Sequence, residues 1–288
     1  MQAIANWLLA RPYNAVLGLA VTLLLPAPQI TSGAIMALLV LAKGNRPAVT
    51  GALIATAILA VATLIVGGTL PAVLVLVAGT WVPALLLTNL LVATRSLTLT
   101  LQVSVIVAIV AMLVFQVVVP DPAVFWQPYL DAMTKVVNDN GLELDTSMLT
   151  AEIMTISAVL VYWMLFTVAM MTGYWFYRQL PGETSNFGRF RELNFGRVIA
   201  FTMALASLLA FVIGAAWLQN IAFILFAMFM MQGLAIMHWL RGEAYLPGFA
   251  LISVYILLPF LQVLLVMLLA LVGYSDAWFD FRRRFAKT

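Results

Sequence analysis

Long apolar stretches alternate with short polar joints along this chain, and the pattern predicts a helical membrane protein. Residues 47–94, 153–177 and 198–237 contain no Lys, Arg, Asp or Glu. A charge at the centre of a bilayer costs roughly 3 kcal/mol or more, and a helix needs roughly 20 apolar residues to cross. We therefore expect six spans, at about 48–66, 70–93, 97–119, 152–177, 198–217 and 221–240. Turn residues at Gly67-Gly68, Arg95-Ser96 and Gln219-Asn220 separate neighbouring spans.

Two terminal elements leave alternatives open. Asn14–Ala42 is interrupted by Pro26-Ala27-Pro28, and Tyr245–Gly273 is interrupted at Pro259. Each could be one kinked span or a shallow hairpin of two short helices. Length favours one span, since half of such an element reaches only about 21 Å as a helix. Charge favours the hairpins, which would place the basic residues on one side of the membrane.

The expected fold is all-α: a polytopic transmembrane helix bundle with six full-length spans and two Pro-broken terminal elements, giving eight or more membrane helices. Of the 288 residues, 65% are apolar and 9% charged, which indicates a single transmembrane domain over 1–288. The polar segment 120–151 is too small to build a core of its own. The net charge of +3 belongs to membrane-side loops, so it does not indicate nucleic-acid binding.

The loops differ in charge, which predicts their sides. The acidic 120–151 segment has Lys135 as its only base and is expected outside, whereas the basic 178–197 loop is expected in the cytoplasm. With hairpins at both ends, the termini are cytoplasmic too. The outer segment has apolar residues at helical spacing and predicts an amphipathic surface helix, either a lid or a surface-resting connection. Its apolar positions are Phe125, Tyr129, Met133 and Val136, and Asn138–Gly141 ends it, with Asp145–Ser147 as a cap for the next span.

The tail 275–288 combines aromatic and basic residues. A continuous helix there would place Asp280 and Arg284 four residues apart, suitable for an ion pair. The pattern is typical of an interfacial anchor, and the alternative is a docking site for a cytoplasmic partner. The candidate surface residues are Asp276, Trp278, Asp280, Arg282, Arg283 and Arg284 of the tail, with Arg189 and Arg191 of the basic loop.

A few polar residues fall in or near the spans. Gln232, His238, Gln102 and Gln262 are ligand-binding candidates, against the commoner role of an amide that bonds across helices or a histidine at the interface. Small residues at Ala200, Ala204, Ala206, Ala210 and Gly214 would allow close helix packing, either within the bundle or with a helical partner. The methionine and aromatic density of 163–177 and 223–239 could form an adaptable apolar pocket or ordinary packing.

The usual chemical motifs are missing from the sequence. There is no GxxxxGK[ST] loop, no HExxH, no Ser/His/Asp set, no cysteine and only one histidine. We therefore expect no catalytic activity, no cofactor and no metal.

The chain resembles one family at three places: Ile30–Gly44, Gln232-Gly-Leu-Ala with His238, and Asp276–Arg284. These resemble the YybS-like family of bacterial predicted membrane proteins, a domain of unknown function. The resemblance implies a multi-pass protein of the bacterial inner membrane and a distant similarity to the S components of energy-coupling-factor transporters. S components bind a micronutrient and present an Ala-xxx-Ala face on their first helix; here that spacing occurs at Ala200–Ala204.

Two functions follow as hypotheses. The first is a transport-type subunit that binds a small apolar or amphipathic solute or a lipid within the bilayer. The second is a structural or regulatory subunit that binds another membrane protein through its small-residue and Arg-rich surfaces.

Overall fold

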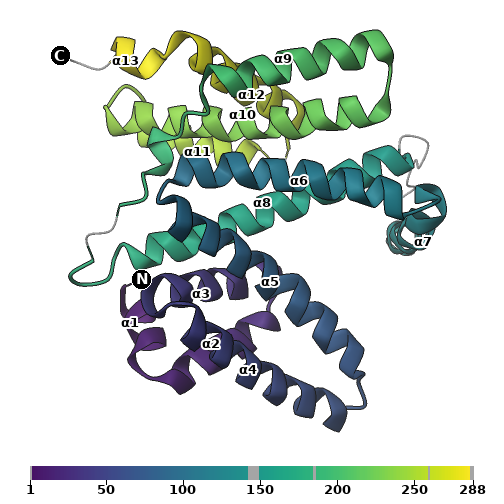
Figure 1. Cartoon of the computed structure of the whole chain (residues 1–288), viewed down its shortest axis with the longest axis vertical. Coiled ribbons are helices and arrows are strands. Elements are labelled where there is room, and N and C mark those ends of the chain that lie inside the picture. The colour runs from purple at the N-terminus through teal and green to yellow at the C-terminus, as the bar shows by residue number, and fades with distance from the viewer. Residues whose placement is uncertain (1, 142–148, 184–185, 259, 286–288) are drawn as a thin grey trace. The chain divides into compact units, whose positions relative to one another are not determined.

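Helices make up almost all of the computed structural model, which describes residues 2–141, 149–183, 186–258 and 260–285, with the side chains of Gln262 and Phe285 excepted. These residues contain no strand. Within the described residues six helices are long and apolar enough to cross a membrane, which confirms the polytopic helical bundle (Figure 1). They are α4 (Asn45–Ile65), α5 (Leu70–Thr94), α6 (Leu97–Val118), α8 (Ala151–Tyr177), α9 (Gly196–Ile213) and α10 (Ala216–Gly242).

One predicted boundary was wrong. The turn between the fifth and sixth spans is not at Gln219-Asn220 but at Gly214, which adopts the left-handed conformation at φ 71° and ends α9. Glycine enters this region without the steric cost that a Cβ imposes, so Gly214 is a helix stop and not part of a packing stripe. Gln219 and Asn220 lie in the first turns of α10 instead.

The chain folds into two compact units. Unit 1 contains residues 1–101 and 162–187, and unit 2 contains residues 102–161 and 188–288. Helices α6 and α8 contribute residues to both units. Each unit is described by itself.

Unit 1 begins with a hairpin and not with one kinked span. After α1 (Gln2–Ala10), helix α2 (Pro12–Leu23) turns at Ala27 into α3 (Pro28–Lys43). The two helices run antiparallel, because Thr31 donates its hydroxyl to the Thr22 carbonyl at 3.0 Å and Ser32 donates to the Leu19 carbonyl at 3.1 Å. Both ends of the hairpin therefore lie on the same side of unit 1.

Basic residues gather at that side of unit 1. Lys43 Nζ donates to the Leu9 carbonyl at 2.7 Å, so the end of α3 meets the end of α1. Asn45 Nδ2 donates to Asn89 Oδ1 at 2.7 Å, which brings the start of α4 beside the end of α5. Arg11, Lys43, Arg46 and Arg95 consequently belong to one end of the unit.

The second terminal element is also a hairpin. Helix α11 (Gly248–Leu257) folds back along α10, because Tyr255 Oη lies 2.8 Å from His238 Nε2 and Gly248 lies beside the Arg241 guanidinium. Helix α12 (Gln262–Phe279) then returns parallel to α10, as the pairing of Phe229 with Tyr274 and the shared pocket below show. Figure 1 shows α9, α10 and α12 side by side.

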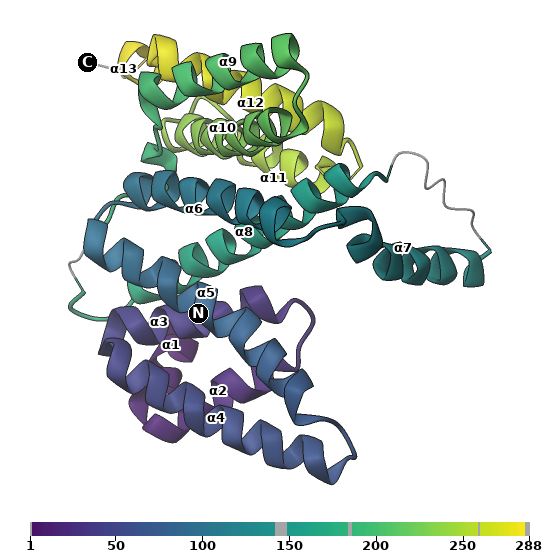
Figure 2. The same ribbon diagram turned by 45° about the vertical axis from the view of Figure 1, so that its right-hand side comes forward.

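The amphipathic helix predicted in the segment 120–151 is present as α7 (Pro122–Asp139), and its position outside the membrane stays a prediction. Asp121 caps its N-terminus by accepting from the amides of Ala123 and Val124, and Gly141 follows at φ 73°. Figure 2 shows α7 projecting from the ends of α6 and α8. Near its start its aromatic residues contact those helices: Trp126 Nε1 donates to Thr155 Oγ1 at 2.8 Å, and the Phe125 ring packs edge-on against Phe115. The proposed cap at Asp145–Ser147 lies outside the described residues, and Thr150 Oγ1 accepts from the Ile153 amide at 3.3 Å.

Candidate binding pocket and buried polar network

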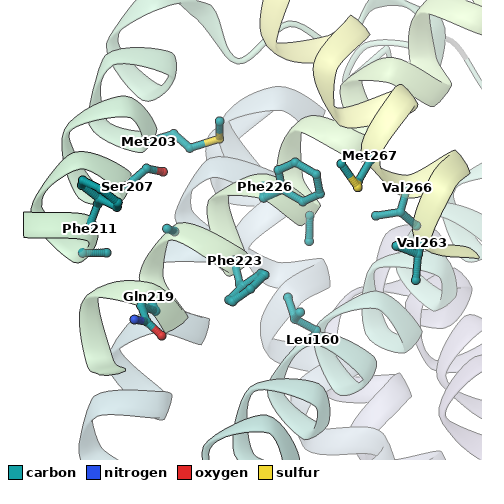
Figure 3. Close-up of a pocket in the computed structure, with 13 residues that line it drawn as sticks. Leu160, Met203, Ser207, Phe211, Gln219, Phe223, Phe226, Val263, Val266 and Met267 are labelled. Atoms are coloured by element: carbon teal, nitrogen blue, oxygen red, sulfur yellow. The ribbon is translucent and has the colours of Figure 1, made fainter. Parts of the chain in front are cut away.

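A pocket of about 730 Å³ opens in unit 2 between α8, α9, α10 and α12 (Figure 3). This volume falls in the roughly 300–1,000 Å³ range of small-molecule sites. It lies towards the end of unit 2 away from residues 188–195, because its lining residues come from the C-terminal part of α9 and the first half of α10. The lining residues are Leu160, Met203, Ser207, Ala210, Phe211, Gln219, Ala222, Phe223, Phe226, Ala227, Val263, Val266 and Met267.

The pocket wall is almost entirely apolar. Phenylalanine, methionine, leucine, valine and alanine supply every described lining side chain except Ser207 and Gln219, and none of the lining residues is charged. Methionine is flexible and polarisable, so Met203 and Met267 can adapt to ligands of different shape. A wall of this kind binds hydrocarbon through dispersion, and its described side chains offer hydrogen bonds at two positions.

Beyond the pocket, further along both helices, the backbones of α10 and α12 are in direct contact. A Cβ added at Gly233 would overlap the Leu269 carbonyl, and one added at Gly273 would overlap the Phe229 carbonyl. Small residues permit such close helix crossings in membranes, where dispersion and interhelical polar contacts hold helices together. The crossing fixes the spacing of the two helices that form the pocket's inner wall.

A buried polar network lies on the other side of that crossing. The Asp276 carboxylate is fully buried and accepts from Arg282 Nη2 at 2.7 Å, from Gln232 Nε2 at 2.9 Å and from the Phe281 amide at 3.0 Å. The Arg282 side chain is 10% exposed and also donates to the carbonyls of Arg191 and Leu193. Three donors, one of them the Arg282 guanidinium, therefore satisfy this buried carboxylate.

The network ties the basic loop to the helices. Gln232 Oε1 accepts from the Phe195 amide at 2.8 Å, and Gln102 Nε2 donates to the Phe195 carbonyl at 3.0 Å. The backbone of Phe195 is therefore held on both sides, from α10 and from α6. Both glutamines use their amides inside the protein, and neither lines the pocket.

The tail is not one continuous helix. Helix α12 ends at Phe279, Asp280 adopts the left-handed conformation at φ 48°, and α13 (Phe281–Phe285) begins after it. This break lets Arg282 reach Asp276, six residues earlier. Asp280 lies 3.7 Å from Arg283 in an exposed ion pair, so the expected Asp280–Arg284 pairing was wrong. Arg197 Nη2 donates to the Trp278 carbonyl at 3.2 Å, which is a second hydrogen bond between the tail and the basic loop.

The remaining predicted site residues lie outside the pocket or outside the described side chains. His238 contacts Tyr255 and packs edge-on against Phe190, with ring centroids 5.3 Å apart. The side chain of Gln262 is not described. Arg189 pairs with Glu192 at 3.9 Å, and the Arg191 guanidinium lies against Gly242. Arg284 is exposed near the Phe279 ring.

The small residues of α9 pack inside unit 2. Ala200, Ala206 and Ala210 are buried, Ala204 is half-buried, and Ala210 contributes to the pocket wall. Close packing of α9 against its neighbours within the unit accounts for the buried members.

Sequence reasoning pointed to part of the pocket and missed its polar positions. The aromatic and methionine density of 223–239 included Phe223 and Phe226, which do line it. Ser207 and Gln219 gave no signal, because a serine inside a helix and a glutamine assigned to a turn carry no motif. Only the placement of α9 beside the first turns of α10 brings them together.

No protein-family model, curated protein or solved structure matches this chain. The site therefore has to be interpreted from its own geometry, and the resemblance to the YybS-like family stays a prediction.

Proposed function

We propose that this protein is a non-catalytic subunit of a bacterial inner membrane that binds a small apolar or amphipathic solute, or a lipid, in the pocket of unit 2. The observation that carries the proposal is the pocket of about 730 Å³ with its uncharged, Phe- and Met-rich wall. In a multi-pass membrane protein such a cavity faces hydrocarbon, so molecules dissolved in the bilayer are its natural ligands.

The two hairpins support an orientation in which both termini are cytoplasmic. If each of the six long apolar helices crosses the bilayer once, the number of crossings between the two hairpins is even, which favours an orientation with both hairpins on the same side of the membrane. The described basic residues then face the cytoplasm, apart from Lys135 on α7. The pocket consequently lies in the outer half of the bilayer. Movement of a bound solute would draw on a partner or on the solute's own gradient.

Lipid extraction and mass spectrometry test the binding function. The full chain is purified in mild detergent, and its co-purifying molecules are compared with those of Ala222→Phe and Ala227→Phe, which fill the pocket. Ala78→Phe makes the same change at an exposed position of α5 and serves as the control. We expect a stoichiometric apolar molecule in the wild type and in Ala78→Phe, lost from both pocket variants. Equal recovery from all four proteins would refute the proposal.

A second candidate function, a regulatory subunit that binds another membrane protein, is favoured by one observation. The tail and the basic loop, distant in sequence, are joined by Arg282 and Arg197 into one basic surface that leaves the Arg283 side chain 87% exposed. Affinity purification from the native membrane under mild detergent tests this function. Recovery of a stoichiometric partner that is lost in Arg283→Glu supports it, and recovery of the chain alone contradicts it.

A further inference from the structure

The two polar side chains of the pocket have no hydrogen-bond partner among the described residues. Ser207 and Gln219 are both exposed to the cavity region, and neither the hydroxyl nor the amide is satisfied by the described part of the protein. Other hydroxyls on these helices behave differently: Thr202 donates to the Val198 carbonyl at 3.0 Å. A polar group without a partner in an apolar environment is unfavourable, so a ligand atom at this place would gain a hydrogen bond without competing for an existing one.

The two polar residues of the wall lie on the same side of the pocket, together with some of its apolar residues. Figure 3 shows Ser207 and Gln219 on one side with Phe211, whereas Phe226, Val266 and Met267 lie on the opposite side. Gln219 lies in the first turn of α10, at the outer end, whereas Phe226 comes about two turns later on the same helix and is deeper. A ligand with one polar head and an apolar body matches this arrangement.

The residues that line the pocket indicate the charge of the ligand's polar head group. None of the described lining residues is Lys, Arg, His, Asp or Glu, so an ionic head would lose its hydration without gaining a counter-ion from them. A serine hydroxyl and a glutamine amide each donate and accept, as do alcohols and carboxamides. Resting on the proposed function, we propose that the ligand is an uncharged amphiphile whose hydroxyl or amide head hydrogen-bonds to Ser207 and Gln219 while its hydrocarbon body fills the space beside Phe226 and Met267.

A chain-matched ligand series tests the head group. Radiolabelled dodecanol is bound to the full chain in nanodiscs and displaced by dodecanol, dodecanamide, dodecanoate or dodecylamine, at a pH where the last two are ionised. We expect the alcohol and the amide to compete at least about tenfold better than either ion. Ser207→Ala and Gln219→Leu should each weaken dodecanol binding several-fold.

Two variants outside the pocket serve as controls. Ser253→Ala removes a hydroxyl that already bonds to the Phe249 carbonyl, and Gln127→Leu removes an exposed amide of α7; both should bind dodecanol normally. Gln219→Glu should shift the preference towards dodecylamine. If the ions compete as well as the alcohol, the head-group assignment is overturned while the binding function stands. If dodecanol does not bind at all, both proposals fail.

Discussion

Asp276 and Arg282 form an ion pair across the break that ends α12, with Arg282 Nη2 at 2.7 Å from Asp276 Oδ2. The pair closes a turn in which Asp276 also accepts from the Phe281 amide. Through Gln232 and the carbonyls of the basic loop, this one carboxylate connects α10, α12, α13 and residues 190–195. It is a buried polar link between the tail and the basic loop of unit 2.

Loss of the carboxylate should destabilise the protein strongly. Asp276→Leu leaves a buried guanidinium without its partner, which costs about 3–5 kcal/mol. Thermal denaturation in mild detergent should show a large fall in Tm. Adding Arg282→Met removes the orphaned charge and should restore part of the loss. Asp280→Asn, which affects only the exposed pair with Arg283, should leave the Tm close to that of the wild type. Equal shifts for Asp276→Leu and Asp280→Asn would contradict this role.

The α10–α12 crossing should tolerate no side chain at its glycines. Gly233→Ala and Gly273→Ala place a methyl group against backbone that cannot move without separating the helices, so each should destabilise by roughly 1–3 kcal/mol or prevent folding. Gly79→Ala on α5, where no atom lies within 4 Å of the added Cβ, is the matched control. Expression level and Tm are the measurements. A normal Tm for Gly233→Ala would show that the helices are not in backbone contact.

Unit 1 contains a buried hydrogen-bond chain that can be measured separately. Trp81 Nε1 donates to Ser32 Oγ at 2.7 Å, and Ser32 donates to the Leu19 carbonyl. Ser32→Ala leaves the indole N–H unsatisfied and should cost about 1–3 kcal/mol. In a protein that already carries Trp81→Phe, Ser32→Ala should cost less stability, because the indole N–H that Ser32 accepts from is absent. A double-mutant cycle measures the difference, and perfectly additive effects would mean that the bond contributes nothing.

The hairpins predict where each loop is accessible. The chain has no cysteine, so single cysteines can be introduced without background. Arg11→Cys, Gly182→Cys and Arg283→Cys should react with a membrane-impermeant maleimide only from the cytoplasmic side, and Lys135→Cys only from the opposite side. If Arg11→Cys or Arg283→Cys reacts from the same side as Lys135→Cys, that terminal element is a full span.

The spans could be predicted from sequence because each is defined by a local property, its apolar length. The terminal elements could not, since length and charge favoured different structures. The N-terminal element is a hairpin because Ala27 adopts the left-handed conformation and Thr31 and Ser32 donate hydrogen bonds to α2. These contacts depend on which carbonyls a hydroxyl meets after the chain folds back, and no spacing rule encodes that.

The candidate site was less predictable than the fold. Asp276 and Arg282 belong to a tail that is distinctive in the sequence, but the spacing rule for a continuous helix pairs Asp280 with Arg284 instead. The left-handed break at Asp280 changes the spacing that brings partners together. Gln232 and Gln102 stand out because they are polar and apolar-flanked, a property shared by ligand-binding amides and by structural ones. Only the hydrogen-bond partners distinguish the two roles.

Whether unit 2 holds an apolar molecule in the bilayer is tested most directly by an experimental density map of the protein in lipid nanodiscs. We expect an elongated non-protein density between α9, α10 and α12, in contact with Phe223, Phe226 and Met267 and with one end at Ser207 and Gln219. A map in which those side chains fill the cavity and no non-protein density is present there would contradict the binding function.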